Sequence, residues 1–219
     1  MIPERINSNK KNGLKRTVVI CLLFLFFCTE SADAEKKQVI VAFGDSLTAG
    51  LGVPANQAYP AQLAKKLSIN GHPSKVVNAG VSGETTAGGL RRIRWIFKNQ
   101  PDIVILCLGA NDGLRGLSLL EMEKNLSKII TALQKEKVKV ILAGMKIPPN
   151  YGIRYTRAFE AVYPRLAKRF ELPLIPFLLE GVATRPTLNQ ADGIHPTAEG
   201  YKIIVDHMWP IVQKVLKTN

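Results

Sequence analysis

Hydrophobic residues in this chain alternate between short continuous runs and longer stretches with helical spacing. From residue 35 onward the continuous runs are rich in Val, Ile and Leu, as is typical of strands buried on both faces of a parallel sheet. Between the runs, residues such as Leu119, Met122 and Leu126 recur every three or four positions, as on one face of an amphipathic helix. The pattern predicts strands at Val39–Phe43, Lys75–Ala79, Ile103–Leu108, Val138–Ala143 and Leu174–Phe177, and helices at about Tyr59–Leu67, Thr85–Lys98, Leu119–Lys135, Tyr155–Phe170 and Thr197–Lys217.

Alternating strands and helices predict an α/β fold, in which helices cover both faces of a five-stranded parallel sheet. Pro210 is expected to bend or restart the last helix. Neither a repeat nor a linker divides residues 35–219, so we expect them to form a single domain. In such sheets, ligands bind beyond the carboxyl ends of the strands.

The first 34 residues have the features of a secretory signal peptide. Basic residues between Lys10 and Arg16 precede the apolar run Val18–Cys28, and Ala32-Asp33-Ala34 suits cleavage after Ala34. The apolar run is shorter than the roughly 20 residues that span a bilayer, which favours a cleaved leader over a retained anchor helix. We therefore expect a periplasmic or secreted bacterial protein with no transmembrane span after cleavage, although the sequence leaves the anchor open.

The charge and the cysteines restrict the partners and the chemistry. Removing 1–34 takes five of the 30 Lys and Arg and three of the 17 Asp and Glu, leaving a formal net charge of +11. Such a surface suits peripheral contact with anionic lipid, whereas no basic stripe interleaved with aromatic residues indicates nucleic acid. Cys107 is then the sole cysteine, so no internal disulfide is expected, and the histidines lack the spacing of a metal site.

Polar residues follow three predicted strands and also occupy the last loop. Gly44-Asp45-Ser46, Gly80 and Asn111 follow the first three strands, and Asp192 and His195 lie three positions apart before the last helix. A serine with a histidine base and a carboxylate that orients the base forms a catalytic triad, here Ser46, His195 and Asp192. The N–H groups of Ser46 and Gly80 and the Asn111 amide are the predicted oxyanion donors.

Each of these clusters alone is ordinary turn chemistry, and only their order at successive strand ends favours acyl transfer. Asp45 precedes the nucleophile directly, so we expect it to cap the following turn rather than act as the triad acid. The loop Met145–Tyr155 is rich in Pro and Gly and follows the fourth strand. It is either a packed surface loop or one wall of an apolar groove for an acyl chain.

The blocks "FGDSLTAG", "NAGVSGETT", "LGANDGLRG" and "DGIHPT" resemble those of the SGNH (GDSL) hydrolases. The sequence is similar to the bacterial acyl-CoA thioesterase I, lysophospholipase L1 and arylesterase subgroup from about Gln38 to Lys217. The resemblance implies a three-layer, flavodoxin-like α/β/α fold. It also implies a serine esterase without metal or cofactor, acting on thioesters, aryl esters and lysophospholipids. We expect the small-molecule acyl ester or lipid substrate to contact Leu47, Leu114, Pro149, Tyr151 and Ile194.

Two alternatives stay open at this point. Polysaccharide deacetylases of the same family use the same residues, and a catalytically silent lipid-binding module would keep the fold without the chemistry. Neither the preferred acyl length and leaving group nor the oligomeric state follows from the sequence.

Overall fold

The computed structural model describes residues 1, 3 and 37–217, and Lys37–Asn219 belong to one compact unit. The predicted signal peptide, 1–34, lies outside the described residues except at positions 1 and 3, so its prediction stays untested. The described part begins two residues before the first strand, and each strand bound differs from its prediction by at most two residues.

A five-stranded parallel sheet forms the centre, with the strand order β2-β1-β3-β4-β5. This is the flavodoxin-like order, and it confirms the predicted α/β architecture. β2 lies at an edge and is half exposed, so the expectation that every strand is buried on both faces is wrong for this strand. The strands are β1 (Val39–Gly44), β2 (Lys75–Gly80), β3 (Ile103–Cys107), β4 (Lys139–Ala143) and β5 (Leu174–Ile175).

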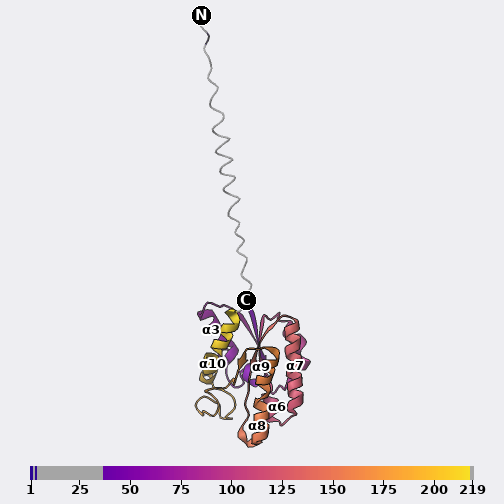
Figure 1. The fold of residues 1–219 in the computed structure, drawn as a ribbon. Coiled ribbons are helices and arrows are strands. Elements are labelled where there is room, and N and C mark those ends of the chain that lie inside the picture. Colours follow the sequence, from indigo (N-terminus) through magenta and orange to yellow (C-terminus); the bar gives the residue numbers. More distant parts are fainter. Residues whose placement is uncertain (2, 4–36, 218–219) are drawn as a thin grey trace. The chain divides into compact units, whose positions relative to one another are not determined.

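Helices cover both faces of the sheet (Figure 1). On one side α3 packs against α10, and on the other side α7 packs against α4 and α9. Short helices follow β1 and β3 at the carboxyl edge. The helices are α2 (Ser46–Ala49), α3 (Tyr59–Ile69), α4 (Thr86–Arg91), α5 (Ile93–Phe97), α6 (Ala110–Leu114), α7 (Leu119–Lys135), α8 (Ile153–Glu160), α9 (Val162–Phe170) and α10 (Ala198–Lys217), with 3₁₀ turns η1 (Ala55–Gln57) and η2 (Pro149–Tyr151).

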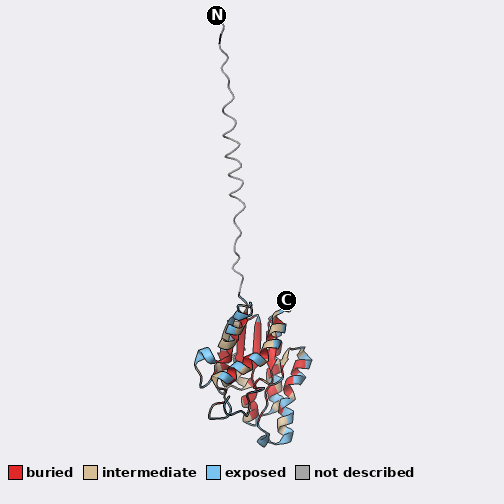
Figure 2. Cartoon of the chain, turned by 90° about the vertical axis from the view of Figure 1, so that its left-hand side faces the viewer, coloured by how far each residue is buried: buried red, intermediate tan, exposed pale blue. Residues whose placement is uncertain are grey.

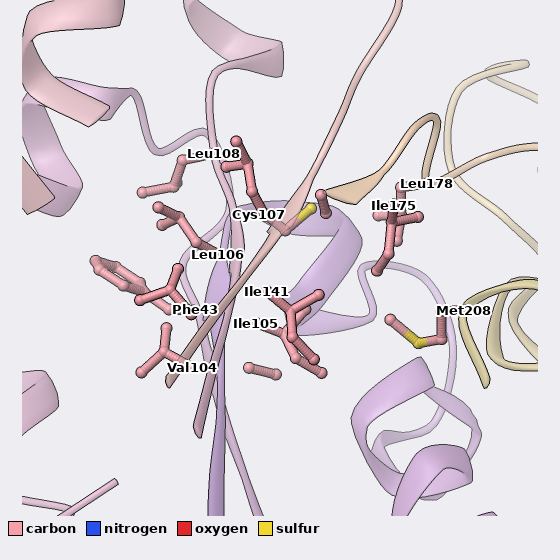
Figure 3. Close-up of a cluster of buried hydrophobic side chains, with 14 of the residues drawn as sticks. Phe43, Val104, Ile105, Leu106, Cys107, Leu108, Ile141, Ile175, Leu178 and Met208 are labelled. Carbon is pink, nitrogen blue, oxygen red and sulfur yellow. The ribbon is translucent and has the colours of Figure 1, made fainter. Parts of the chain in front are cut away.

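The core lies on both faces of the sheet, between it and the helices (Figure 2). Along β3 the side chains alternate, so that Leu106 points to the side of Phe43, whereas Ile105 and Cys107 point to the side of Met208 in α10 (Figure 3). Cys107 is 1% exposed, as expected of a small core residue. The buried alternation fixes the register of the strands and therefore which residues meet at their carboxyl ends.

Three predicted helices differ from the structure in instructive ways. The segment predicted as Thr85–Lys98 is broken at Arg92, and Tyr155–Phe170 is broken at Ala161. In contrast, α10 runs through Pro210 as one helix, so of the two expected outcomes, a bend or a restart, the restart does not occur. Proline removes the hydrogen bond to the carbonyl four residues earlier, on Asp206. Both residues are exposed, so water can bond that carbonyl.

Candidate active site

The sharp turn after β1 places Ser46 at the start of α2. Asp45 is the N-cap of this helix, and its Oδ1 accepts a hydrogen bond from the N–H of Leu47 at 3.0 Å. The expected capping role of Asp45 is therefore seen in the structure. Within residues 37–217, the N–H of Ser46 itself meets no acceptor, so it is free to bind a ligand.

The structure brings Ser46, His195 and Asp192 into one line of hydrogen bonds. His195 Nε2 lies 2.8 Å from Ser46 Oγ, and His195 Nδ1 lies 2.7 Å from Asp192 Oδ2. A carboxylate can only accept, so Nδ1 carries the proton and Nε2 accepts from the serine hydroxyl. Residues 149 positions apart thus meet at one point, which the parallel sheet makes possible.

Asp192 is held as an ionised acceptor. The backbone N–H and the ring of His195, together with the N–H of Ile194, lower the pKa of Asp192 from 3.8 to about 2. Its Oδ1 accepts these two N–H groups at 2.9 and 2.8 Å, while Oδ2 faces the ring. The carboxylate therefore keeps its charge and the orientation of the imidazole over a wide pH range.

Gly80 and Asn111 reach the same region, but both already have partners. Gly80 N–H donates to Asn78 Oδ1 at 3.0 Å, and Asn111 Nδ2 donates to the Glu84 carbonyl at 3.0 Å and to Asp45 Oδ2 at 3.2 Å. A substrate oxygen would have to share these donors. Such contacts keep the donors in place before a substrate arrives.

Packing inside the protein requires glycine at position 80. A Cβ at Gly80 would lie 2.1 Å from the Ala49 nitrogen, inside the backbone of α2. Gly80 therefore allows the end of β2 to pack against the helix that carries Ser46.

Asp45 is a buried carboxyl group directly beside Ser46, with 1% of its surface exposed. Burial raises the pKa of Asp45 from 3.8 to about 6, even though the N–H of Leu47 and the nearby His195 act in the opposite direction. Its contact with Asn111 was not anticipated from the sequence. The two carboxylates next to Ser46 and His195 thus differ sharply in basicity.

Three further side chains support the site and were missed by sequence reasoning. Asp112, 3% exposed, accepts from the Thr86 N–H at 2.8 Å and from its hydroxyl at 2.6 Å, which ties α6 to the start of α4. Glu84 and Arg92 form an ion pair next to the ends of β1 and β2. The sequence gives no signal for such an ion pair beside strand ends, because tertiary packing decides which carbonyl groups its side chains contact.

The residues predicted to contact the acyl chain fall into two groups. Leu47 is 3% exposed and belongs to the core, so its side chain offers almost no surface to a substrate. Leu114 is half-buried and Pro149 is exposed. Tyr151 and Ile194 are 38% and 45% exposed on loops that follow the strand ends.

Tyrosine hydroxyl groups tie the loop after β4 to the loop after α6. Tyr151 donates to the Leu114 carbonyl at 2.8 Å, and Tyr155 donates to the Leu117 carbonyl at 3.1 Å. The two rings stack with centroids 6.5 Å apart. Exposed Leu117 follows α6 and exposed Ile153 begins α8, so the two joined segments also present apolar side chains.

The described residues contain neither a cluster suited to a metal ion nor a helix suited to span a membrane. Between residues 37 and 217, His, Cys, Asp and Glu side chains nowhere gather in threes as a metal ion would need. The helices in that range are also too short or too polar to cross a bilayer.

Residues 42–203 match the GDSL-like Lipase/Acylhydrolase family, so the chain belongs to this family of hydrolases and the resemblance of its motifs is confirmed. It is 39% identical to "Esterase TesA" of Pseudomonas aeruginosa, over 89% of this chain and 96% of that protein. "Thioesterase 1/protease 1/lysophospholipase L1" of Escherichia coli is 39% identical over 85% of this chain and 89% of its own. The crystal structure of TesA matches with a TM-score of 0.79 at 39% identity, covering 81% of this chain and 99% of that one.

Proposed function

We propose that this protein is a serine hydrolase that cleaves acyl esters and thioesters through Ser46, His195 and Asp192. One observation carries the proposal: the hydrogen bonds of 2.7 and 2.8 Å that join the carboxylate, the imidazole and the hydroxyl. The names of the relatives, esterase, arylesterase and thioesterase, agree with this chemistry.

In the first half of the reaction, Ser46 Oγ attacks the substrate carbonyl carbon while His195 Nε2 takes the hydroxyl proton. Asp192 stabilises the imidazolium that forms and holds Nδ1 in place. The imidazolium then gives its proton to the leaving alcohol or thiol, and an acyl-enzyme remains. In the second half, His195 activates a water molecule, which releases the acid and restores Ser46.

The N–H groups of Ser46 and Gly80 and the Asn111 amide bind the oxygen that becomes negative during attack. Ser46 N–H is free to do so, whereas Gly80 and Asn111 share protons with Asn78 and Asp45. Charge-assisted bonds are about twice as strong as neutral ones, so the developing oxyanion can compete with the neutral Asn78 side chain.

We infer that the acyl part of the substrate lies along the apolar rim formed by Leu114, Leu117, Pro149, Tyr151 and Ile194. An apolar surface distinguishes chain lengths by only about 1–3 kcal/mol per methylene, so broad activity on thioesters, aryl esters and lysophospholipids is expected. Cleavage of 1–34 would place the enzyme in the periplasm or outside the cell. There its basic surface could contact anionic lipid.

The decisive test replaces Ser46 by Ala and measures p-nitrophenyl ester hydrolysis. We expect kcat to fall by roughly 10⁴-fold or more, because the nucleophile is lost. Ser68→Ala, on the exposed side of α3, is the matched control and should keep full activity. Hydrolysis that persists in Ser46→Ala would contradict the proposal.

A substrate panel and a covalent probe separate the alternatives. Long-chain acyl esters should be cleaved faster than acetylated xylan, whereas the reverse order would indicate a polysaccharide deacetylase. A fluorophosphonate probe should label the wild-type chain at Ser46 and not label Ser46→Ala. A wild-type chain that binds lipid and stays unlabelled would be a binding module.

A further inference from the structure

Arg92 lies behind the candidate active site, at the break between α4 and α5. Its side chain is 19% exposed. Its Nη2 donates to the carbonyl of Ala79 at 2.8 Å and to that of Gly44 at 3.3 Å. The guanidinium therefore joins the carboxyl ends of two strands: β2, which ends at Gly80, and β1, which Ser46 follows after one residue.

Close packing of α4 on the sheet brings Arg92 to this position. A Cβ at Gly89 would lie 2.4 Å from Leu108 Cδ1 and 3.2 Å from Phe43 Cζ, so only glycine lets the helix approach this far. The Arg92 guanidinium then lies over the Phe43 ring, 4.6 Å from its centroid. Stacking on a buried ring and a fixed helix end together restrict where the guanidinium can be.

The carbonyl that Arg92 binds belongs to the same peptide group as a proposed oxyanion donor. Ala79 C=O and Gly80 N–H are the two ends of one planar unit, and in a trans peptide they point in opposite directions. A charged donor on the oxygen fixes the plane of this unit and draws electron density from the nitrogen. Its N–H therefore becomes a stronger donor on the far side, as in any hydrogen-bonded chain.

Glu84 links the same guanidinium to a second proposed donor. Arg92 Nε donates to both carboxylate oxygens of Glu84, at 2.7 and 2.9 Å, and Nη2 also contacts Oε2. The Glu84 side chain is 7% exposed, so the pair is largely shielded from water. The backbone carbonyl of the same Glu84 accepts the Asn111 amide at 3.0 Å. The Arg92–Glu84 ion pair is therefore linked to both proposed donors, to Gly80 through the Ala79 carbonyl and to Asn111 through the Glu84 carbonyl.

We propose that Arg92, together with Glu84, is a positioning residue for the oxyanion donors, acting through the Ala79–Gly80 peptide and through the segment that holds Asn111. This inference rests on the proposed function. It assigns to Arg92 no contact with substrate, since its guanidinium lies on the opposite side of the peptide from the donor N–H.

The test compares an oxygen ester with the matching thionoester, in which sulfur replaces the carbonyl oxygen. Sulfur accepts hydrogen bonds weakly, so thionoester turnover depends little on the oxyanion donors. Arg92→Gln should lower kcat for the oxygen ester by about 10- to 100-fold, less than the roughly 100- to 1000-fold loss on removal of a donor. The kcat for the thionoester should fall only a few-fold, so the ratio of the oxygen-ester kcat to the thionoester kcat falls.

Arg91→Gln is the matched control, because Arg91 is the exposed neighbour and carries the same charge. Its rate ratio should equal that of the wild type. Arg92→Lys keeps a charged donor without the planar guanidinium that binds Glu84, so its rate ratio should lie between those of Arg92→Gln and Arg91→Gln. If Arg92→Gln does not fold, the ratio of Arg92→Lys tests the inference. The shape of the pH profile should not change, because Arg92 does not contact His195.

Two results would overturn the inference: equal losses on both esters, which indicate general damage to the fold, or a ratio for Arg92→Gln and Arg92→Lys that matches Arg91→Gln. If the wild-type chain is active, either result leaves the proposed function intact. A wild-type chain that cleaves neither ester would instead contradict the proposed function itself.

Discussion

Asp45 and Asp192 show at the residue scale how surroundings separate two chemically identical groups. Burial raises the pKa of Asp45 to about 6, whereas N–H groups of His195 and Ile194 lower the pKa of Asp192 to about 2. Asp192 is therefore charged at every pH at which the enzyme would work. Asp45 changes its charge within a mildly acidic range, directly beside Ser46.

A pH dependence of stability follows for Asp45. Its folded-state pKa lies above its unfolded value, so the native state binds the proton more tightly and the free energy of unfolding falls as the pH rises through this range. Between pH 4 and 7 the wild type should lose about 2 kcal/mol relative to Asp45→Asn, at about 1.4 kcal/mol per pKa unit. Urea unfolding of both proteins at several pH values measures this difference.

Ser68→Ala, at an exposed position of α3 without a titratable group, is the control for this experiment and should keep the wild-type dependence on pH. Parallel stability curves for the wild type and Asp45→Asn would show that the buried carboxyl group does not titrate in this range.

At the scale of elements, the rim of the site is built from two loops fastened to each other. Hydroxyl groups on η2 and α8 bond to carbonyls of the segment that follows Asn111. Loops tend to move independently of each other unless such contacts join them. The surface that these residues form therefore depends on a few hydrogen bonds between the short elements η2, α8 and α6 and not on the central sheet.

Removing these hydroxyl groups should affect binding more than chemistry. In the double variant Tyr151→Phe, Tyr155→Phe, we expect the KM for a long-chain ester to rise about fivefold, since each lost bond contributes about 1 kcal/mol or less at exposed sites. The kcat for a short ester should stay within about twofold. Steady-state kinetics on both esters give the comparison.

Tyr163→Phe is the control for position, because its buried hydroxyl donates to the Leu108 carbonyl at 3.1 Å within the core. It should lower Tm and leave the KM values alone. A fall in short-ester kcat as large as the rise in long-ester KM for the double variant would contradict a role confined to binding.

At the scale of the whole molecule, one core supports the sheet and all the strand ends that meet at the site. The buried residues run from Val39 in β1 to Val215 in α10. The core of the described residues therefore lies within the segment predicted to remain after cleavage.

A chain that begins at residue 35 should consequently fold and act like the full chain freed of its leader. We expect Tm to agree within about 2 °C and kcat/KM within about twofold. We compare two proteins, the full-length chain after processing in a bacterial host and the chain made from residue 35. Calorimetry gives their Tm values, and ester hydrolysis gives their kcat/KM values. A shortened chain that does not fold would show that part of 1–34 belongs to the domain.

Much of the fold could be predicted because its signals are local. Runs of Val, Ile and Leu give the strands, and the spacing of three and four gives α7 with its exact bounds. The predicted helix bounds fail where local pattern and tertiary contact disagree, as at Arg92, whose side chain bonds the strand ends at a break in the predicted helix. At Pro210 the helix continues without a restart, because the carbonyl freed by the proline belongs to an exposed residue.

For the site, the sequence by itself determined which chemistry-bearing residues follow the strands, and that Asp192 and His195 lie close enough to pair within one loop. Only the tertiary structure decided how they meet. It brought the hydroxyl of Ser46 to His195, buried Leu47, explained Gly80 by its contact with α2, and joined Asp45 to Asn111. These outcomes depend on side-chain directions and on packing between segments far apart in the chain, which short-range patterns do not encode.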